Sequence, residues 1–153
     1  MLDYLEAVSG ESDFLLTGPG ETHRSIESEE AFIARGCEGN SLLLVAVDDA
    51  ENIISIASLQ AGRLPRIAHQ AELGVSVRRD WWNRGVGRAM LERIERHARA
   101  AEGLEVITLT VMADNARAIG LYRSLGYREI GRFPKYMKIG DGYKDALLMN
   151  LYL

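Results

Sequence analysis

Residues 72–101, ELGVSVRRDWWNRGVGRAMLERIERHARAA, form the stretch that decides the fold. In the first six residues apolar side chains alternate with polar or small ones, which predicts a strand over 72–77. A turn over 81–85 follows. From 86 to 101 apolar residues recur at three- and four-residue steps, which predicts an amphipathic helix that Gly103 ends. Ion pairs Glu92–Arg96 and Glu95–Arg99 are expected on its solvent face.

The residues after this stretch continue the alternation of strands and helices. Residues 106–111 are nearly all β-branched, which predicts another strand. Asp114 or Asn115 is placed to cap a helix that stops at Gly126. Two further strands are expected, over 127–137, where Pro134 breaks the strand, and over 145–153. The succession of strand, helix and strand implies a right-handed crossover between parallel neighbours.

Two helices and two strands are expected before residue 72. Residues 2–8 favour a short helix, 12–22 a loop, and 28–35 a second helix that Ser28 caps and Gly36 ends. The apolar run 41–47 is typical of a strand covered on both faces, and 52–61 supplies its antiparallel partner. We therefore predict one α/β domain over residues 1–153, with a mixed central sheet and helices on both faces.

The composition narrows the classes of function. With 47% hydrophobic and 26% charged residues, the chain of 153 residues is typical of a soluble globular protein. The net charge of −4 gives no general attraction to nucleic acid. Cys37 is the single cysteine, so an internal disulfide is excluded and a free thiol in a reducing compartment is expected. The sequence lacks a signal-peptide pattern and a bilayer-length apolar run, which predicts a cytoplasmic protein without membrane association.

The turn Asn83-Arg84-Gly85-Val86-Gly87-Arg88 has the features of a diphosphate site. The N–H groups at the start of a helix lack partners within it, and the helix dipole adds partial positive charge there. Gly85 and Gly87 let a phosphate approach the backbone, while Arg84 and Arg88 add full charges. Glycines also suit an ordinary turn, so both interpretations stay open for this motif alone. A P-loop would need a Gly-Lys-Ser/Thr ending, and a dinucleotide fingerprint would need Gly or Ala at 90, where Met stands.

A second motif follows the next predicted strand. Residues 115–127, NARAIGLYRSLGY, match Asn-x-x-Ala-x-x-Leu-Tyr-x-x-x-Gly-Phe/Tyr at every specified position. The glycine turn matches both glycines of Gln/Arg-x-x-Gly-x-Gly/Ala but has Trp82 at the first position. With these two motifs the chain resembles the GNAT superfamily of N-acetyltransferases over residues 41–153. Members of that superfamily usually begin with a strand before the first helix, and no such strand is predicted here.

The resemblance implies that acetyl-CoA is the co-substrate and that no metal is needed. It implies that residues 83–88 bind the diphosphate and that the backbone of Val77 binds the pantetheine arm, where two parallel strands separate. Asn115 would bind the same arm and cap its helix, and Tyr122 would direct its hydroxyl at the sulfur. Each side chain also has a purely structural interpretation, as a core valine, a helix cap and a packed tyrosine.

An acceptor amine must lose a proton before it attacks a thioester. Glu72 begins the central strand, where this superfamily often has a general base or a carboxylate that holds a water; otherwise it is a solvated charge. His69 is the reserve candidate, whereas His23 and His97 are expected at the surface. The expected reaction is direct transfer of the acetyl group to a primary amine of a small molecule or protein. Backbone N–H groups near Val77 would stabilise the oxyanion and Tyr122 would protonate the thiolate.

Two other classes of function fit the same residues. One is a non-catalytic acyl-CoA-binding sensor or accessory module. The other is an accessory domain associated with RNA or protein, and the acidic balance argues against RNA. The acceptor is not specified, although residues 11–35 and the hairpin around 140–145 are expected to wall its pocket. The sequence also leaves open whether the chain forms a homodimer.

Overall fold

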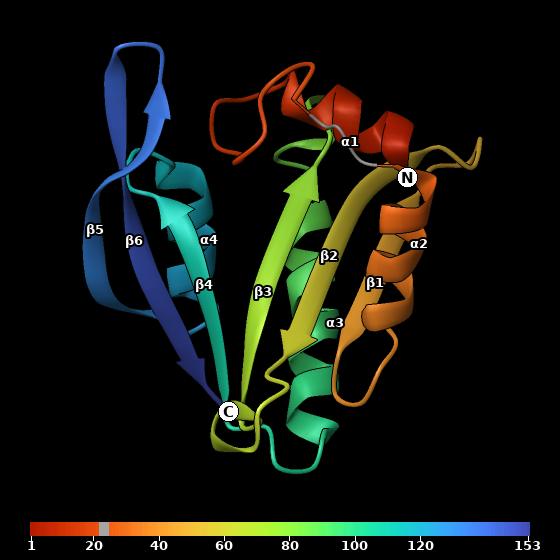
Figure 1. Cartoon of the computed structure of the whole chain (residues 1–153), viewed down its shortest axis with the longest axis vertical. Helices are drawn as coiled ribbons and strands as arrows, with labels where there is room; N and C mark the ends of the chain where they lie inside the picture. Colours follow the sequence, from red (N-terminus) through yellow and green to blue (C-terminus); the bar gives the residue numbers. More distant parts are fainter. Residues whose placement is uncertain (22–24) are drawn as a thin grey trace.

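The computed structural model describes residues 1–21 and 25–153, which form a six-stranded mixed sheet with helices on both faces (Figure 1). The strand order is β1-β2-β3-β4-β6-β5. The helices are α1 (Leu2–Ser9), α2 (Ile26–Arg35), α3 (Val86–Ala100) and α4 (Ala116–Ser124), with short 3-10 turns η1 (Pro65–Ile67) and η2 (Arg79–Trp81). The strands are β1 (Leu42–Val47), β2 (Ile53–Ala61), β3 (Gln70–Val77), β4 (Val106–Met112), β5 (Arg128–Ile139) and β6 (Gly142–Tyr152). The predicted fold class is confirmed.

Strands β3 and β4 are parallel neighbours, and α3 makes the crossover between them as predicted. The other neighbouring strands pair in antiparallel fashion. Strand β6 is the last in the sequence, yet it lies inside the sheet between β4 and β5. The sheet therefore consists of an antiparallel meander, β1 to β3, joined to the three remaining strands through one parallel pair.

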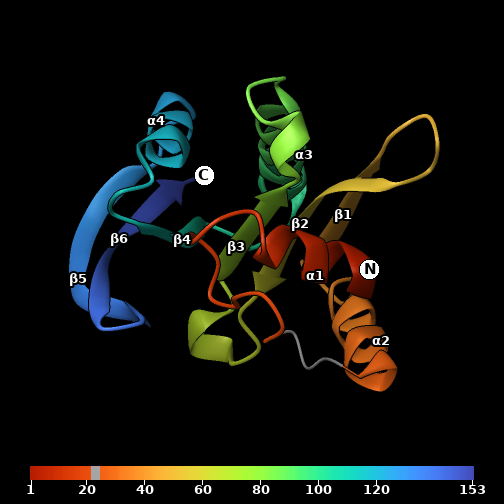
Figure 2. The same cartoon turned by 90° about the horizontal axis from the view of Figure 1, so that it is seen from above.

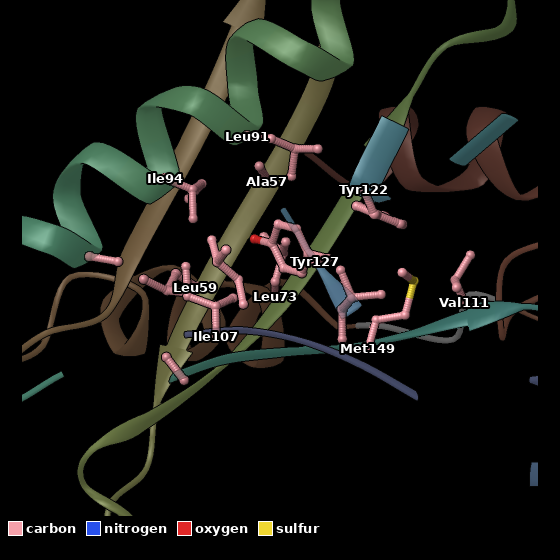
Figure 3. Close-up of a cluster of buried hydrophobic side chains, with 14 of the residues drawn as sticks. Ala57, Leu59, Leu73, Leu91, Ile94, Ile107, Val111, Tyr122, Tyr127 and Met149 are labelled. Carbon is pink, nitrogen blue, oxygen red and sulfur yellow. The ribbon is translucent and has the colours of Figure 1, made fainter. Parts of the chain in front are cut away.

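The two faces of the sheet carry different helices, with α3 and α4 on one face and α1 and α2 on the other (Figure 2). The larger core lies between the sheet and α3 and α4, and it includes the fully buried Leu59, Leu91, Ile94 and Ile107 (Figure 3). A smaller cluster of Tyr4, Val8 and Ile56 joins α1 to the opposite face. Because full burial of a Leu or Ile is worth about 1.5–3 kcal/mol, the α3 side supplies most of the apolar stabilisation.

Strands β3 and β4 separate after only three register pairs. They pair from Gln70 with Val106 to Glu72 with Thr108. Beyond that point β3 continues to Val77 and β4 to Met112 without pairing to each other. Helix α3 follows the end of β3 and α4 follows the end of β4, so both helices begin at the open end of this fork.

Strand β1 is not covered on both faces, so the prediction that it would be is wrong. It pairs only with β2, and Val45 and Val47 are 44% and 53% exposed. Leu42, Leu44 and Ala46 pack against the main core, whereas Val45 and Val47 lie on the other face, which the helices leave partly in solvent.

Helix α2 begins two residues earlier than predicted, and its cap is Ser25 rather than Ser28. The Ser25 hydroxyl accepts a hydrogen bond from the Ser28 N–H, and the Ser28 hydroxyl donates to the Ser25 carbonyl. Both serines thus take part in the capped turn, but the chain enters the helix at Ile26. Gly36 ends the helix as expected.

Two local predictions about β5 and α3 are also corrected. Strand β5 continues through Pro134 with an irregular register between Phe133 and Met137, which an edge strand tolerates because its outward N–H groups need no partner. In α3, Glu92 lies 3.7 Å from Arg88 instead of pairing with Arg96. Glu95 is half-buried rather than on the solvent face, and burial raises the pKa of its carboxyl although the charge of Arg99, its predicted partner, acts in the opposite direction. None of the helices in the described part of the chain has both the length and the apolar character for a membrane crossing.

Candidate active site

A cleft of about 540 Å³ occupies the fork between β3 and β4. The first turn of α3, helix α4, the loop after α1 and part of β5 complete its walls. Side chains of Ala71, Leu73 and Val75 belong to the core beneath α3, whereas Ser76 bonds through its Oγ to the Tyr4 hydroxyl of α1. Side chains thus alternate between the faces along β3, and the cleft passes through the sheet from the α3/α4 side to the α1 side.

Backbone N–H groups of β3 point into this cleft. The N–H of Arg78 donates to Ile54 and the carbonyl of Gln70 accepts from Gly62, so even-numbered residues of β3 bond to β2. Backbone groups alternate in direction along an antiparallel strand. The N–H groups of Val75 and Val77 therefore point away from β2, toward the gap that β4 leaves open.

Gly85 and Gly87 of the turn are glycine for different structural reasons. Gly85 is the N-cap of α3 with a φ of 82°, a conformation that favours glycine. A Cβ built at Gly87 would be 3.5 Å from Leu121 Cδ2 and 3.8 Å from Val77 Cγ2, which are ordinary contacts. Neither conformation nor packing requires glycine at 87. Because Gly87 lines the cleft at the N-terminus of a helix, an approaching ligand is the remaining physical reason for its missing side chain.

The charged side chains of the turn differ in position. Arg88 lines the cleft, donates to the Ser124 hydroxyl at 2.7 Å and lies near Glu92. Arg84 is outside the cleft lining, and its guanidinium lies 5.2 Å from the centre of the Trp81 ring. Asn83 and Val86 line the cleft as expected. The structure thus brings all predicted turn residues except Arg84 to the cleft.

Trp82, which replaces the usual Gln or Arg of the motif, bridges the two arms of the fork. Its indole N–H donates to the Val77 carbonyl at 2.7 Å, which ties the turn to the end of β3. The Arg117 guanidinium of α4 lies over the same ring at 3.6 Å. Burial lowers the pKa of Arg117, yet a guanidinium keeps its charge. This stack was not predicted from the sequence, where the unusual Trp82 in the motif is the signal that could have revealed it.

Asn115 and Tyr122 both line the cleft from α4. Asn115 is the N-cap, and its Oδ1 accepts from the Ala118 N–H at 3.2 Å. The predicted capping role is confirmed. Tyr122 is 8% exposed and its ring lies 5.6 Å from that of Tyr127. Burial raises the pKa of Tyr122 to about 12, so the phenol stays protonated at neutral pH.

Glu72 lies at the vertex of the fork, on the opposite face from Tyr122. It is the third residue of β3 and the last to pair with β4, opposite Thr108. Its side chain is exposed and lines the α1 side of the cleft. Two candidate catalytic groups thus reach one cleft from opposite faces of the sheet.

The remaining titratable candidates are not brought to this cleft. His69 contacts Gln70 Nε2 at 3.1 Å and does not line the cleft. His97 contacts the Asn40 carbonyl, and Cys37 is exposed. His23 lies outside the described residues. Within residues 1–21 and 25–153, no three or more His, Cys, Asp or Glu side chains gather in a way that could hold a metal ion.

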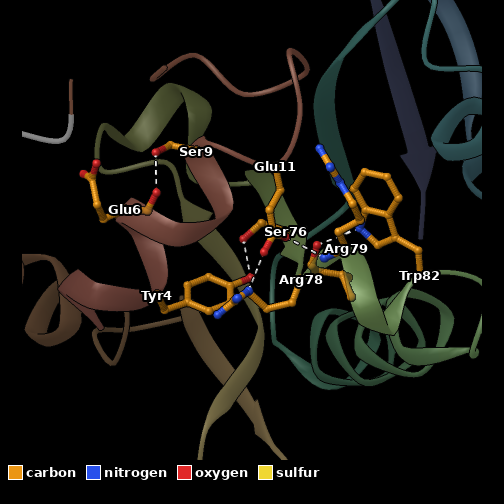
Figure 4. Close-up of polar contacts among 9 residues, drawn as sticks. Tyr4, Glu6, Ser9, Glu11, Ser76, Arg78, Arg79 and Trp82 are labelled. Atoms are coloured by element: carbon orange, nitrogen blue, oxygen red, sulfur yellow. Dashed lines mark hydrogen bonds and ion pairs between the residues drawn. The ribbon is translucent and has the colours of Figure 1, made fainter. Parts of the chain in front are cut away.

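The loop after α1 forms part of the wall on the α1 side, as expected. Glu11 fixes its start, because one carboxylate oxygen accepts from Arg78 Nε at 2.7 Å and the other from the Arg79 N–H (Figure 4). Phe14 and the two residues that follow it, Leu15 and Leu16, then line the cleft. From the C-terminal hairpin, Tyr136 lines it, while Lys144 lies 4.9 Å from the Phe14 ring. Helix α2 and the hairpin tip are not part of the lining.

Comparison with known proteins assigns the family. A sequence model of the acetyltransferase (GNAT) family matches residues 12–127. L-amino acid N-acetyltransferase AaaT of Escherichia coli K12 is 32% identical over 69% of this chain and 65% of that protein. Ribosomal protein bS18-alanine N-acetyltransferase of Salmonella typhimurium LT2 is 30% identical over 81% of this chain and 79% of that protein. The chain belongs to the GNAT family of acetyltransferases.

A solved structure agrees with this assignment. A GNAT-family acetyltransferase from Streptococcus pneumoniae superposes with a TM-score of 0.93 at 27% identity, over 99% of this chain and 91% of that chain. The chain spans between about half and two thirds of the length of the first curated relatives it matches.

Proposed function

We propose that this chain is an acyl-CoA-dependent N-acetyltransferase that moves an acetyl group from acetyl-CoA to a primary amine of a small molecule or protein. The named relatives are N-acetyltransferases of amino acids or of a ribosomal protein, which supports acetyl transfer. The observation that carries the proposal is a cleft that passes through the sheet, with a helix N-terminus on one face and a carboxylate on the other. An anionic cofactor and an amine can then meet from opposite sides.

The cleft fits acetyl-CoA on three counts. The first N–H groups of α3, Gly87 and Arg88 suit the diphosphate. The unpaired backbone of β3 suits the amide-bearing pantetheine arm. Asn115 retains an amide –NH2 beyond the oxygen that caps α4, which can serve the same arm. Bound acetyl-CoA supplies the thioester that the amine attacks, and the chain supplies the groups around it.

We assign proton removal to Glu72, acting through a water that it orients, and donation toward the leaving sulfur to Tyr122. The geometry of β3 indicates which backbone N–H group would contact the oxyanion and which would contact the pantetheine arm. At about 3.3 Å per residue, Val77 lies about 16 Å along β3 from Glu72 and Val75 about 10 Å. A carbonyl attacked by an amine near Glu72 is therefore closer to the Val75 N–H. We assign oxyanion stabilisation to Val75 and the pantetheine contact to Val77.

Thiol release in the presence of acetyl-CoA and a panel of primary amines tests the proposed function. We expect acetyl-CoA-dependent thiol release with at least one amine and acetylation of its nitrogen by mass spectrometry. A protein that binds CoA in calorimetry but turns over none of the amines, amino acids, polyamines or peptides would instead support the non-catalytic binding module.

Gly87→Val is expected to lower CoA affinity by about a hundredfold or more while the protein still folds. The added side chain occupies the surface where the phosphate would meet the helix N-terminus. The loss of charge-assisted hydrogen bonds from several N–H groups to the phosphate is large enough to lower the affinity by this factor. Calorimetric titration with CoA measures the effect. Gly120→Val is the matched control, because Gly120 is also a helical glycine, a Cβ added to it would meet no atom within 4 Å, and it lies outside the cleft. Wild-type affinity in a folded Gly87→Val variant would refute the diphosphate site.

A further inference from the structure

The α1 side of the cleft has an unusual charge balance for an enzyme that would bind a small amino acid. Among the described residues that line this side, Glu72 is the only charged one. The others carry hydroxyl groups or apolar side chains, and they include Ser12, Ser76 and Tyr136 together with Phe14 and Leu16. An amine therefore finds a carboxylate on this side, whereas a carboxylate finds no cation among the described residues that line it.

Four of the described basic side chains that line or border the cleft are already engaged. Arg88 and Arg117 line the cleft from α3 and α4, where Arg88 bonds Ser124 and Arg117 stacks on Trp82. Arg78 and Lys144 border the α1 side. Arg78 is paired with Glu11 at 2.7 Å, and Lys144 with Asp114 at 2.9 Å. Recruiting either cation for a substrate would leave its carboxylate partner without a counter-charge.

This arrangement discriminates between two kinds of α-amino group. In a free amino acid, the carboxylate is attached to the carbon that carries the amine, so it would enter the site beside Glu72 as a second negative charge. In a polypeptide, the same position is an uncharged amide, which can bond to the hydroxyls of Ser12 or Tyr136. Like charges at short range in a partly desolvated site are unfavourable.

We propose that the acceptor is the N-terminal α-amino group of a polypeptide rather than a free amino acid. This inference rests on the proposed acetyltransferase function and specifies its substrate class. The mouth of the cleft suits a longer acceptor as well. Leu16 is 67% exposed at this mouth, where it offers apolar contact to residues beyond the first.

Matched acceptors test the proposal directly. For a set of L-amino acids, we compare kcat/KM for the free acid, the amino-acid amide and a short C-terminally amidated peptide with the same first residue. We expect the amides and peptides to exceed the free acids by about tenfold or more, the scale of a removed like-charge contact. Free acids that react as well as their amides would overturn the inference while leaving acetyl transfer intact. A lack of acetylation of every acceptor would instead refute the proposed function itself.

A variant with an added charge tests whether the preference for amides and peptides comes from the charge of the acceptor or from its size. Leu16→Arg adds a cation at the mouth, and it should raise kcat/KM for free acids relative to amides by about threefold or more, the modest gain of a partly solvated charge pair. Leu64→Arg is the matched control, because Leu64 is also 67% exposed but lies outside the cleft lining. The control should leave the ratio unchanged. A ratio that stays the same in Leu16→Arg, or changes equally in both variants, would contradict the electrostatic explanation.

Discussion

Tyr122→Phe is expected to lower turnover by about ten- to a thousandfold, the range for one lost donor in a transition state. The ring still fills its place against Tyr127, so acetyl-CoA affinity and the free energy of unfolding should stay near their wild-type values. A pKa of about 12 keeps the phenol protonated at neutral pH, when it can donate a hydrogen bond to a forming thiolate. Because a thiol has a pKa of about 8.5, complete transfer of the proton is uphill, and hydrogen bonding supplies most of the effect.

Steady-state kinetics with an accepted amine, together with calorimetry for acetyl-CoA, measure this effect. Tyr127→Phe is the control, because its hydroxyl is buried, has no hydrogen-bond partner among the described residues and does not line the cleft. Its turnover should match wild type. If Tyr122→Phe lost affinity and rate equally, Tyr122 would only shape the cleft. Unchanged kinetics would remove it from the mechanism.

Glu72→Gln should lower the rate by about a hundredfold or more, the usual contribution of a positioned base. The amide keeps the size and the strand position of Glu72 but can neither accept the proton nor hold the water as a base. Glu72 lies at the vertex on the α1 side, away from the diphosphate turn, so acetyl-CoA affinity should barely change.

A pH series of kcat/KM measures this loss. At higher pH more of the amine arrives uncharged, and the variant should recover part of its rate. Glu38→Gln is the control, since it makes the same change in net charge at an exposed side chain that pairs with Arg63 outside the cleft. Near-normal turnover of Glu72→Gln at every pH would mean that another group takes the proton. His69 is no longer the natural replacement, because it does not line the cleft.

The sequence predicted those parts of the molecule that depend on local patterns. The helical spacing over 86–101 and the alternation over 72–77 each describe one element with one buried face, and both elements formed as predicted. The cap at Asn115 and the turn at Gly85 follow from backbone chemistry within a few residues. These features need little information about the rest of the chain.

Features that depend on distant partners were not predictable in the same way. The apolar run of β1 does not reveal whether helices cover both of its faces, and here Val45 and Val47 stay exposed on one of them. The stack of Arg117 on Trp82 joins the first turn of α4 to the loop between η2 and α3, across the cleft. The proposal that Val75 rather than Val77 contacts the oxyanion depends on the position of the fork's vertex, which the strand register supplies.

The interior position of β6 has a consequence for the order in which the chain can fold during synthesis. The meander β1 to β3 is built from neighbouring antiparallel strands, so it can form as soon as it leaves the ribosome. Strands β4 and β5 flank β6 and have no pairing with each other, so each keeps an unpaired edge until β6 has been made. Such edges are prone to pair with other chains. Nascent chains that stall before residue 142 would therefore carry the glycine turn and helix α4 without the strand that holds the second half of the sheet together.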